Sequence, residues 1–306
     1  MNLLTRPSTL RLAVFFSTLP TPWLLAMILL TAPVCLQAQR VESFGVFGGL
    51  NFPFTVDLGL NNDPRYYGQF TVRATPVGFS YGYDHVGYGF LITPSMVKIG
   101  QKFNIRNTAG GEVGKRDVQM TYFTVPVALK LHLNDLAFFR LSAVASVHFD
   151  YLLSGKETIT HTASKLRYPE GVIVPSEPGY DQVYDGVFVP EVNNQVYVGK
   201  DQFNAFQISA GIGFHSDFDF NDNWGMNFDG RAIFGIFDPR KSSYINDLKN
   251  TSPATDLYGQ RREVYLAASV GFARIIQIKE KFRAKSSGRG SGGTSYRQPR
   301  NKKPKG

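Results

Sequence analysis

The stretch that decides the fold of this chain is Val264-Tyr265-Leu266-Ala267-Ala268-Ser269-Val270-Gly271-Phe272. Every second position from Val264 to Phe272 is apolar, and tyrosine, alanine, serine and glycine stand between them. Because successive side chains of a strand point to opposite faces, this period of two predicts a β-strand with one apolar face. The segments 206–215 and 123–132 repeat the pattern, so the chain is predicted to be all-β.

Working outward from this stretch, the same alternation predicts eight strands. They are expected at 42–54, 68–81, 87–101, 123–132, 138–153, 206–215, 223–237 and 264–272. Tight turns at 83–85, 134–136 and 220–223 alternate with long connections at 55–67, 103–117, 154–202 and 238–261. Outer-membrane barrels have short periplasmic turns and long outer loops. We therefore expect an eight-stranded antiparallel up-and-down transmembrane β-barrel with long outer loops and both chain ends on the periplasmic side.

The same alternation would also suit a soluble β-sandwich or a lipocalin-like barrel, but two features favour the membrane. Small residues such as Gly211, Gly213 and Gly271 occupy the polar face, where a narrow interior has little room. Aromatic residues gather near strand ends, as in the girdles of membrane barrels. They are Phe138, Phe139, Tyr151, Phe203, Trp224, Phe237 and Tyr265. Proline donates no ladder hydrogen bond, so bulges are expected at Thr75-Pro76 and Thr93-Pro94.

Residues 1–38 have the order of a secretory signal peptide. Arginines precede the apolar run 23–30, and cleavage is expected after Ala38. A retained membrane anchor fits less well, because the prolines at 20 and 22 shorten the apolar run. A lipoprotein cleaved at Cys35 fits less well because Val34 is a poor residue before such a cysteine. The mature barrel domain, 39–278, then holds no cysteine, which excludes disulfide and thiolate chemistry.

The net charge of +9 belongs to the C-terminal tail, residues 279–306. This segment holds ten Lys or Arg against the single Glu280, whereas the rest of the mature chain is close to neutral. Its Gly, Ser, Lys and Arg composition predicts a disordered basic periplasmic tail. Contact with anionic lipid head groups or a periplasmic polymer stays open. We expect no nucleic-acid partner, because the protein is exported.

An eight-stranded barrel is only wide enough for its own side chains, so a diffusive porin is not expected. The inward positions carry Arg73, Lys130, Arg140, Asp150, Asp229, Arg231, His132, His148 and His215. Buried charges persist only when they are paired, so these residues are predicted to form ion pairs that plug the lumen.

The alternative to a structural lumen is a hydrolytic site. His148 and Asp150 share a face with Ser146, and a histidine oriented by a carboxylate could activate a serine. The segment 78–82 matches G-x-S-x-G, but no helix follows it to form the required elbow. No phosphate-binding loop or zinc spacing is present in the sequence, so we expect neither an enzyme nor a cofactor or metal site.

The strand Tyr122-Phe123-Thr124-Val125-Pro126-Val127-Ala128-Leu129-Lys130 resembles one in the small outer-membrane β-barrel proteins of Bacteroidetes, the family that includes PorT-type barrels. The segments 44–51, 211–214 and 270–272 are similar to that family as well. The resemblance spans the mature chain except for the loop 154–202 and the tail, and it implies a barrel in the cell outer membrane. PorT-type members are linked to a protein secretion system. Other barrels finish at a terminal aromatic residue, whereas this chain continues past Phe272.

The loop 154–202 is the strongest functional candidate. Two apolar runs within 187–198 flank Asn193-Asn194 and predict an extra hairpin at the barrel rim. Tyr168, Tyr180 and Tyr184 offer aromatic contacts of the kind that interfaces favour. We expect a structural or protein-interaction role in the cell envelope through this loop or the basic tail, with outer-membrane lipid around the barrel. A loop that only covers the barrel mouth is one alternative, and an accessory part of a PorT-type secretion machinery is another.

Overall fold

The computed structural model describes residues 40–136 and 138–278. The predicted signal peptide, 1–38, and the predicted tail, 279–306, lie outside these residues. No helix in the described part of the chain is long and apolar enough to cross a membrane.

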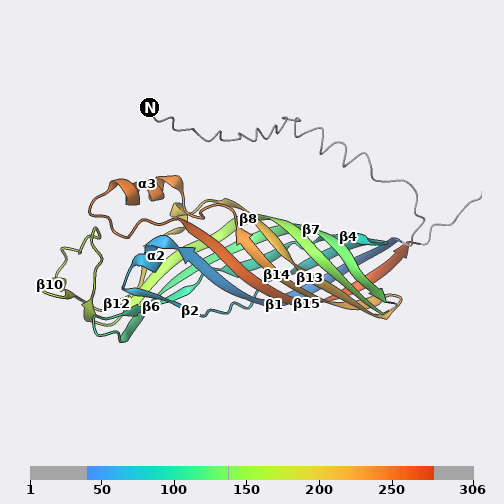
Figure 1. Cartoon of the computed structure of the whole chain (residues 1–306), viewed down its shortest axis with the longest axis horizontal. Coiled ribbons are helices and arrows are strands. Elements are labelled where there is room, and N and C mark those ends of the chain that lie inside the picture. Colours follow the sequence, from blue (N-terminus) through green and yellow to red (C-terminus); the bar gives the residue numbers. More distant parts are fainter. Residues whose placement is uncertain (1–39, 137, 279–306) are drawn as a thin grey trace, which may run out of the picture. The chain divides into compact units, whose positions relative to one another are not determined.

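A closed antiparallel ladder forms the body of the protein (Figure 1). Its members are β1 (Arg40–Asp57), β3 (Val77–His85), β4 (Tyr88–Ile92), β5 (Ser95–Ile99), β7 (Glu112–Leu136), β8 (Phe139–His161), β13 (Phe206–Asn221), β14 (Trp224–Gly235) and β15 (Arg261–Ile278). Each member pairs with its neighbour along the chain, β4 and β5 share the place between β3 and β7, and β15 pairs with β1. The ladder therefore returns to its start and closes a barrel.

The described residues form fifteen strand segments, more than the eight strands that the sequence predicts. One cause is proline. β4 ends just before Thr93-Pro94 and β5 begins just after it, and β3 begins just after Thr75-Pro76. The strands are therefore interrupted at both prolines, where the sequence predicts bulges.

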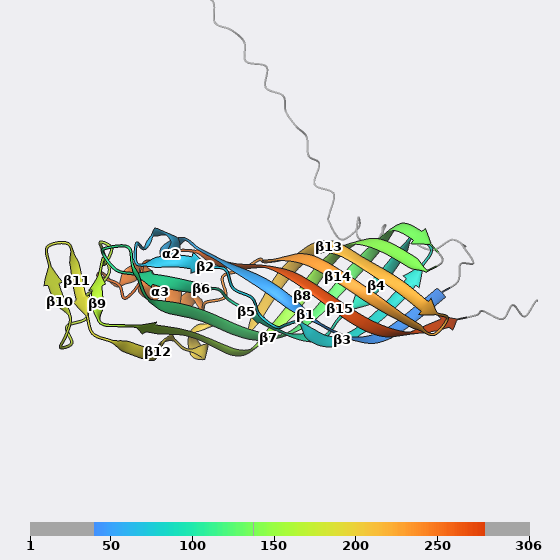
Figure 2. The same cartoon turned by 90° about the horizontal axis from the view of Figure 1, so that it is seen from below.

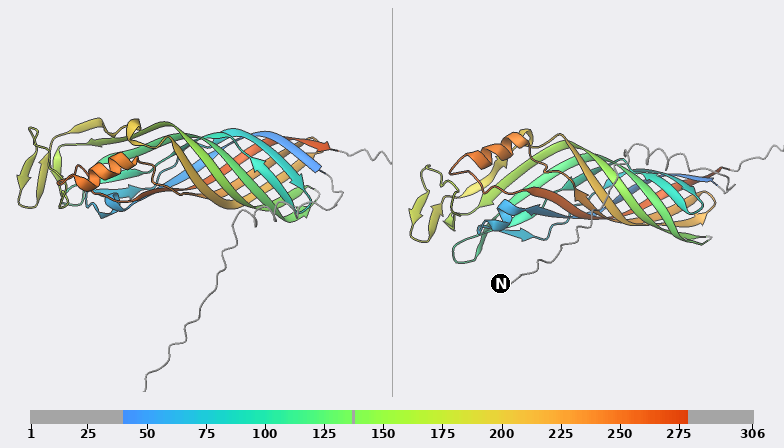
Figure 3. Two further views of the ribbon diagram at one scale, coloured as in Figure 1. Left: turned by 90° about the horizontal axis from the view of Figure 1, so that it is seen from above. Right: turned by 45° about the horizontal axis from the view of Figure 1, so that its top comes forward.

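The other cause of the higher strand count is a set of strands and helices outside the barrel ladder. It comprises α2 (Leu58–Asn62), β2 (Tyr66–Gln69), β6 (Lys102–Arg106), β9 (Ser164–Leu166), β10 (Asp181–Val183), β11 (Gly186–Val189), β12 (Val192–Val198), η1 (Lys200–Gln202) and α3 (Ser242–Asn250). These elements gather at the end that carries the long connections, as Figure 2 shows for β6, β9 and β12. Figure 3 shows α3 at the same end.

The predicted loop 103–117 is wrong, because β6 and the start of β7 form a hairpin there. β7 has 25 residues and β8 has 23. A tilted strand needs only about 9–11 residues to cross a bilayer. Both strands therefore continue well past the membrane, and this extension supports the elements at the outer end.

The two faces of the barrel wall have opposite polarity. Val46, Phe79 and Ile212 point outward and are 53%, 68% and 62% exposed. Lys130 and Ser142 point inward and are buried. A soluble sandwich would bury its apolar face, so this arrangement fits a barrel surrounded by lipid.

The predicted aromatic girdle is confirmed at exposed positions and wrong at two others. Near the short turns, the Trp224 and Phe272 rings stack with centroids 5.1 Å apart. Towards the outer end, the Tyr151 and Phe206 rings lie 5.1 Å apart. Phe203 and Tyr265, however, are buried in the interior. Both side chains pack in the buried apolar cluster. An aromatic residue near a strand end can face either the interior or the lipid, and the sequence pattern alone did not separate the two.

Close packing of β13 on β14 leads to a stability prediction. A Cβ at Gly213 would lie 2.0 Å from the Gly230 carbonyl oxygen and 2.8 Å from the Arg231 Cα, whereas a Cβ at Gly230 meets nothing within 4 Å. We expect Gly213→Ala to lower the free energy of unfolding by about 1–3 kcal/mol through overpacking. The matched control, Gly230→Ala, should cause no loss. Urea unfolding in lipid vesicles measures both, and equal stabilities for the two variants would contradict this packing.

Candidate functional site at the outer end of the barrel

A cluster of buried charges closes the outer end of the barrel, and we call it the rim cluster. Its members are Asp57, Arg116, Glu157, Asp238, Arg240, Asp256 and Arg261. They come from the outer ends of β1, β7, β8 and β15 and from the connection between β14 and β15. Sequence reasoning missed this cluster, because all seven members lie in segments that were predicted to be loops.

Glu157 is the centre of the rim cluster and is 0% exposed. Its Oε2 accepts hydrogen bonds from Arg116 Nη2 at 2.6 Å and from Arg116 Nε at 3.0 Å, and its Oε1 accepts one from Arg261. Arg116 Nη1 also donates to Asp256 Oδ2 at 2.8 Å. Each charge in this group is therefore paired and hydrogen-bonded, which is the condition for burying it.

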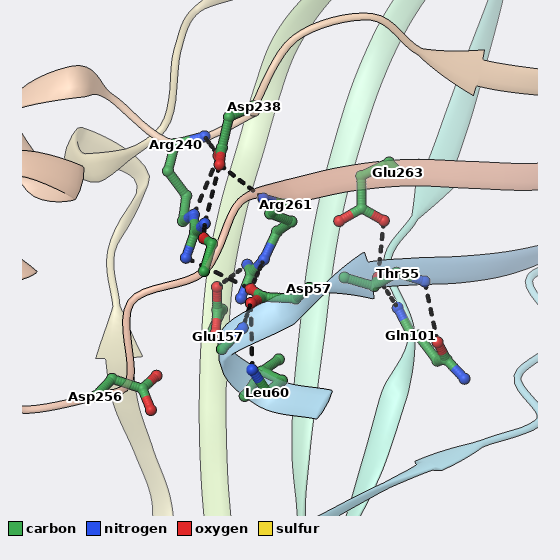
Figure 4. Close-up of polar contacts among 12 residues, drawn as sticks. Thr55, Asp57, Leu60, Gln101, Glu157, Asp238, Arg240, Asp256, Arg261 and Glu263 are labelled. Atoms are coloured by element: carbon green, nitrogen blue, oxygen red, sulfur yellow. Dashed lines mark hydrogen bonds and ion pairs between the residues drawn. The ribbon is translucent and has the colours of Figure 1, made fainter. Parts of the chain in front are cut away.

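Asp57 joins the rim cluster to the neighbouring helix. Its Oδ2 accepts from Arg261 Nε at 2.7 Å, and its Oδ1 accepts from the backbone N–H groups of Gly59 and Leu60 at 2.8 and 3.2 Å. Figure 4 shows Asp57 between Arg261 and Leu60. One carboxylate thus caps α2 and neutralises a buried arginine, which fixes where β1 ends.

Arg240 ties the connection between β14 and β15 onto the same cluster. Its Nη2 donates to Asp238 Oδ2 at 2.9 Å and to the Gly259 carbonyl oxygen. Asp238 Oδ2 also accepts from the Arg261 backbone N–H at 2.8 Å. The long connection is therefore anchored over the barrel mouth by hydrogen bonds to buried charged groups.

An apolar layer lies next along the strands, below the rim cluster. It contains Met120, Tyr122, Leu152, Ile233 and Tyr265, which pack together and are buried. On β7 this layer stands between Arg116 and Lys130. The interior is therefore closed by side chains at several successive levels.

A second set of ion pairs, the inner cluster, occupies the end of the barrel near the short turns. Its ion pairs are Lys130 with Asp84 at 2.7 Å and Asp217 at 3.5 Å, Arg140 with Asp84 at 3.3 Å, and Arg231 with Asp229 at 2.6 Å. The His215 ring nitrogens hydrogen-bond to Asp217 Oδ1 at 3.0 Å and Asp229 Oδ2 at 2.9 Å. The predicted pairing of lumen charges is confirmed for these residues.

Some details of the predicted lumen network differ. Arg73 pairs with Asp117 at 2.8 Å instead of with another predicted lumen residue. His132 Nδ1 lies 2.8 Å from Ser142 Oγ, and its Nε2 lies 3.6 Å from Asp84 Oδ1 of the inner cluster. The acidic partners Asp84 and Asp217 were not predicted, although their inward positions on β3 and β13 could have indicated them.

Of the contacts that the predicted hydrolytic site needs, only the one between the serine and the histidine is present. Ser146 Oγ lies 3.0 Å from His148 Nε2. Asp150 Oδ2 instead accepts a hydrogen bond from Ser209 Oγ at 2.7 Å, on a different strand. The adjoining lumen cavity measures only about 50 Å³, far below the 300–1,000 Å³ of small-molecule sites. Neither the third catalytic member nor room for a substrate is found among the described residues here.

A larger cavity, which we call the outer cavity, lies among the elements at the outer end and measures about 310 Å³. Its aromatic lining consists of Tyr66, Tyr168, Tyr180 and Tyr197. Of the tyrosines predicted for contacts, Tyr168 and Tyr180 line it, whereas Tyr184 is fully exposed at a hairpin turn.

Arg65 organises one wall of the outer cavity. Its guanidinium forms hydrogen bonds to both carboxylate oxygens of Asp63 and lies 4.3 Å from the centroid of the Tyr168 ring. Burial disfavours the charged form of Arg65, but the neighbouring Tyr66 and Asp63 outweigh it and raise the pKa of Arg65 above its ordinary value. Burial likewise raises the pKa of the Tyr168 hydroxyl. On this wall, the charged Arg65 guanidinium therefore stacks against the Tyr168 ring and is held in place by Asp63.

The predicted hairpin around Asn193-Asn194 is wrong. β11 pairs instead with β10 and β9 in a separate three-stranded sheet, and its hairpin turn is Tyr184-Asp185. β12, which contains both asparagines, pairs with the extended end of β8. Asn194 marks a bulge in that pairing and adopts a positive φ of 51°. The asparagines do change the backbone direction locally, but β12 pairs with the extended end of β8 instead of forming a hairpin with β11.

Comparison with solved structures gives weak matches to outer-membrane proteins. The attachment invasion locus protein Ail of Yersinia pestis is 10% identical, with a TM-score of 0.31, and the match covers 79% of this chain and 100% of that one. OprG of Pseudomonas aeruginosa is 9% identical, with a TM-score of 0.35, over 79% and 97%. The outer membrane protease OmpT of Escherichia coli is 10% identical, with a TM-score of 0.34, over 78% and 97%. Similarities this weak do not extend to function.

A search of curated proteins gives no match. The family model for the outer membrane protein beta-barrel domain matches residues 37–238, most of the chain. The polarity of the two wall faces, the closed ladder and this match agree: the protein belongs to the outer membrane protein beta-barrel domain family and resides in the cell outer membrane.

Proposed function

We propose that this protein is a sealed eight-stranded transmembrane barrel that acts non-enzymatically, as a structural or interaction protein whose outer end meets its partner. In this proposal β4 and β5 form one strand of the wall. The observation that carries it is the contrast between a lumen filled by buried ion pairs and an outer end that bears an open cavity and exposed aromatic residues.

The sealing argument rests on burial. Arg116 and Lys130 are each 1% exposed, although they stand at opposite ends of the interior. An eight-stranded barrel leaves space only for side chains, and here those side chains are held by ion pairs. Buried side chains occupy the lumen at both levels, which argues against a porin.

The interaction argument rests on the sheet formed by β9, β10 and β11. Tyr184 at its turn is 107% exposed, and Phe188 on β11 is 48% exposed. Exposed aromatic residues beside a cavity are typical of protein interfaces, where rigid rings provide contact area at low entropic cost.

The PorT-type secretion role rests on the family resemblance, which is carried mainly by the strand Tyr122–Lys130 and also by the segments 44–51, 211–214 and 270–272. Tyr122 packs in the apolar layer, and Lys130 pairs with Asp84. Because barrel packing already accounts for these residue types, the geometry favours the interaction role. A deletion strain separates the two, since defective export of surface proteins would support the secretion role instead.

The rim cluster yields a stability prediction. Glu157→Gln leaves Arg116 and Arg261 without their shared carboxylate, so we expect it to lower the free energy of unfolding by about 3–5 kcal/mol. The control Glu170→Gln changes an exposed carboxylate and should stay within about 0.5 kcal/mol of the wild type. Urea titration in vesicles, followed by tryptophan fluorescence, measures both. A Glu157→Gln variant as stable as the control would show that the rim cluster does not hold the outer end.

The interaction role is tested by photo-crosslinking on intact cells. A p-benzoylphenylalanine replaces Tyr184 or Phe188 at the outer sheet, and Asp222 in a short turn serves as the control position. We expect the two outer positions to give the same discrete adduct and the control to give none of it, because the partner meets the outer end. Adducts absent from both outer positions in protein that is folded and at the surface would contradict the proposal.

A further inference from the structure

The outward face of β5, β7 and β8 changes abruptly from apolar to basic. Met96, Phe123 and Tyr151 are exposed apolar or aromatic residues at the end of the apolar band on these strands. Just beyond them towards the outer end, Lys98 and Lys156 are exposed as well.

Strand register places these residues side by side. Met96 is opposite Phe123, and Phe123 is opposite Tyr151. One step further out, Lys98 is opposite Thr121 on β7, and Gln119, two residues along β7, is opposite Lys156 on β8. The two lysines therefore lie on the strands either side of β7. They are about 10 Å apart across the sheet and about 7 Å apart along it, since adjacent strands are about 4.8 Å apart and a strand rises about 3.3 Å per residue.

Neither lysine has an acidic partner for its ammonium group in the part of the chain that the structure describes. Within residues 40–136 and 138–278, Lys98 and Lys156 form no ion pair through their ammonium groups. The acidic residue that faces outward near them, Asp117, accepts from Arg73 at 2.8 Å and from Gln119 at 2.6 Å. The Asp117 carboxylate is therefore already paired with Arg73.

The exposed lysines just beyond the apolar band lie on one side of the barrel. β13 and β14, which form the neighbouring wall, contain no lysine. On β15, Arg262 stands at the outer edge of the apolar band, but its Nη1 donates to the Ile236 carbonyl oxygen. Of the exposed lysines on β5, β7 and β8, Lys98 and Lys156 therefore lie nearest the apolar band, whereas Lys115 on β7 lies further out.

We propose that Lys98 and Lys156 bind the phosphate groups of anionic lipids in the outer leaflet. Side chains immediately beyond the apolar band meet the head groups, and a lysine ammonium is a compact charge suited to phosphate. Thr121 on β7 lies between the lysines and Ser154 lies beside Lys156 on β8, and both hydroxyls are neutral hydrogen-bond donors. The site holds a lipid against this wall, independently of any partner at the outer sheet.

The test measures lipid retained by the full chain in nanodiscs that contain phosphatidylcholine and a small fraction of bisphosphorylated lipid A. We expect Lys98→Gln with Lys156→Gln to weaken lipid A binding at least about tenfold, given roughly 1 kcal/mol for each lysine near an anionic surface. The matched control, Lys241→Gln at the N-cap of α3 with Lys249→Gln in its last turn, removes the same charge elsewhere and should bind as the wild type does. Lys98→Arg with Lys156→Arg should retain most of the binding.

Raised salt should weaken binding to the wild type and change little in the double glutamine variant. Dephosphorylated lipid A should not be retained. Equal retention by the double glutamine variant and its control, or equal binding of the dephosphorylated lipid, would overturn the proposal. A gel-mobility shift on boiling, kept by every variant, shows that each barrel is folded.

Discussion

The whole structure depends on the pairing of backbone polar groups where no water can reach them. In hydrocarbon, an unpaired N–H or C=O costs several kcal/mol, so a sheet must close on itself. The pairing of β1 with β15 meets this constraint over their full lengths, from Arg40–Ile278 to Asp57–Arg261. Where the ladder fails beside Pro76, side chains take its place: the Lys98 N–H donates to Thr75 Oγ1 at 3.0 Å, and Asn51 Nδ2 donates to the Lys98 carbonyl at 2.7 Å.

Closure of the ladder then dictates what the interior can contain. The apolar faces are committed to lipid, so polar residues turn inward into a space with little water. Charge in that space needs a partner, and the chain supplies partners at both ends of the lumen: Asp84 for Lys130 near the short turns and Glu157 for Arg116 near the outer end. Both sets join residues from several strands, so they also fix the register of the wall from within.

Strand positions and wall polarity were predictable from the sequence because alternation is a local property. The inward positions of Lys130 and Arg231 follow from parity alone, and both are buried as expected. The rim cluster was not predictable, since Glu157 and Arg261 are separated by 104 residues and both lay in predicted loops. Alternation assigns inward and outward positions only within a predicted strand, so it gives no such assignment for residues in a predicted loop. The hairpin at Asn193-Asn194 failed for a related reason, because the free edge of an extended β8 outweighed a local turn preference.

The extension of β8 also links the three regions to which function is assigned. Along this one strand, Tyr151 stands at the edge of the apolar band, Lys156 at the proposed lipid site, Glu157 in the rim cluster and His161 at the outer cavity. Lys156 and Glu157 are consecutive and so face opposite sides of the wall. The same short stretch therefore presents a cation to the lipid and an anion to the interior. A strand held on both faces has little freedom to move, and the outer cavity that it carries is accordingly positioned by the membrane and by the barrel together.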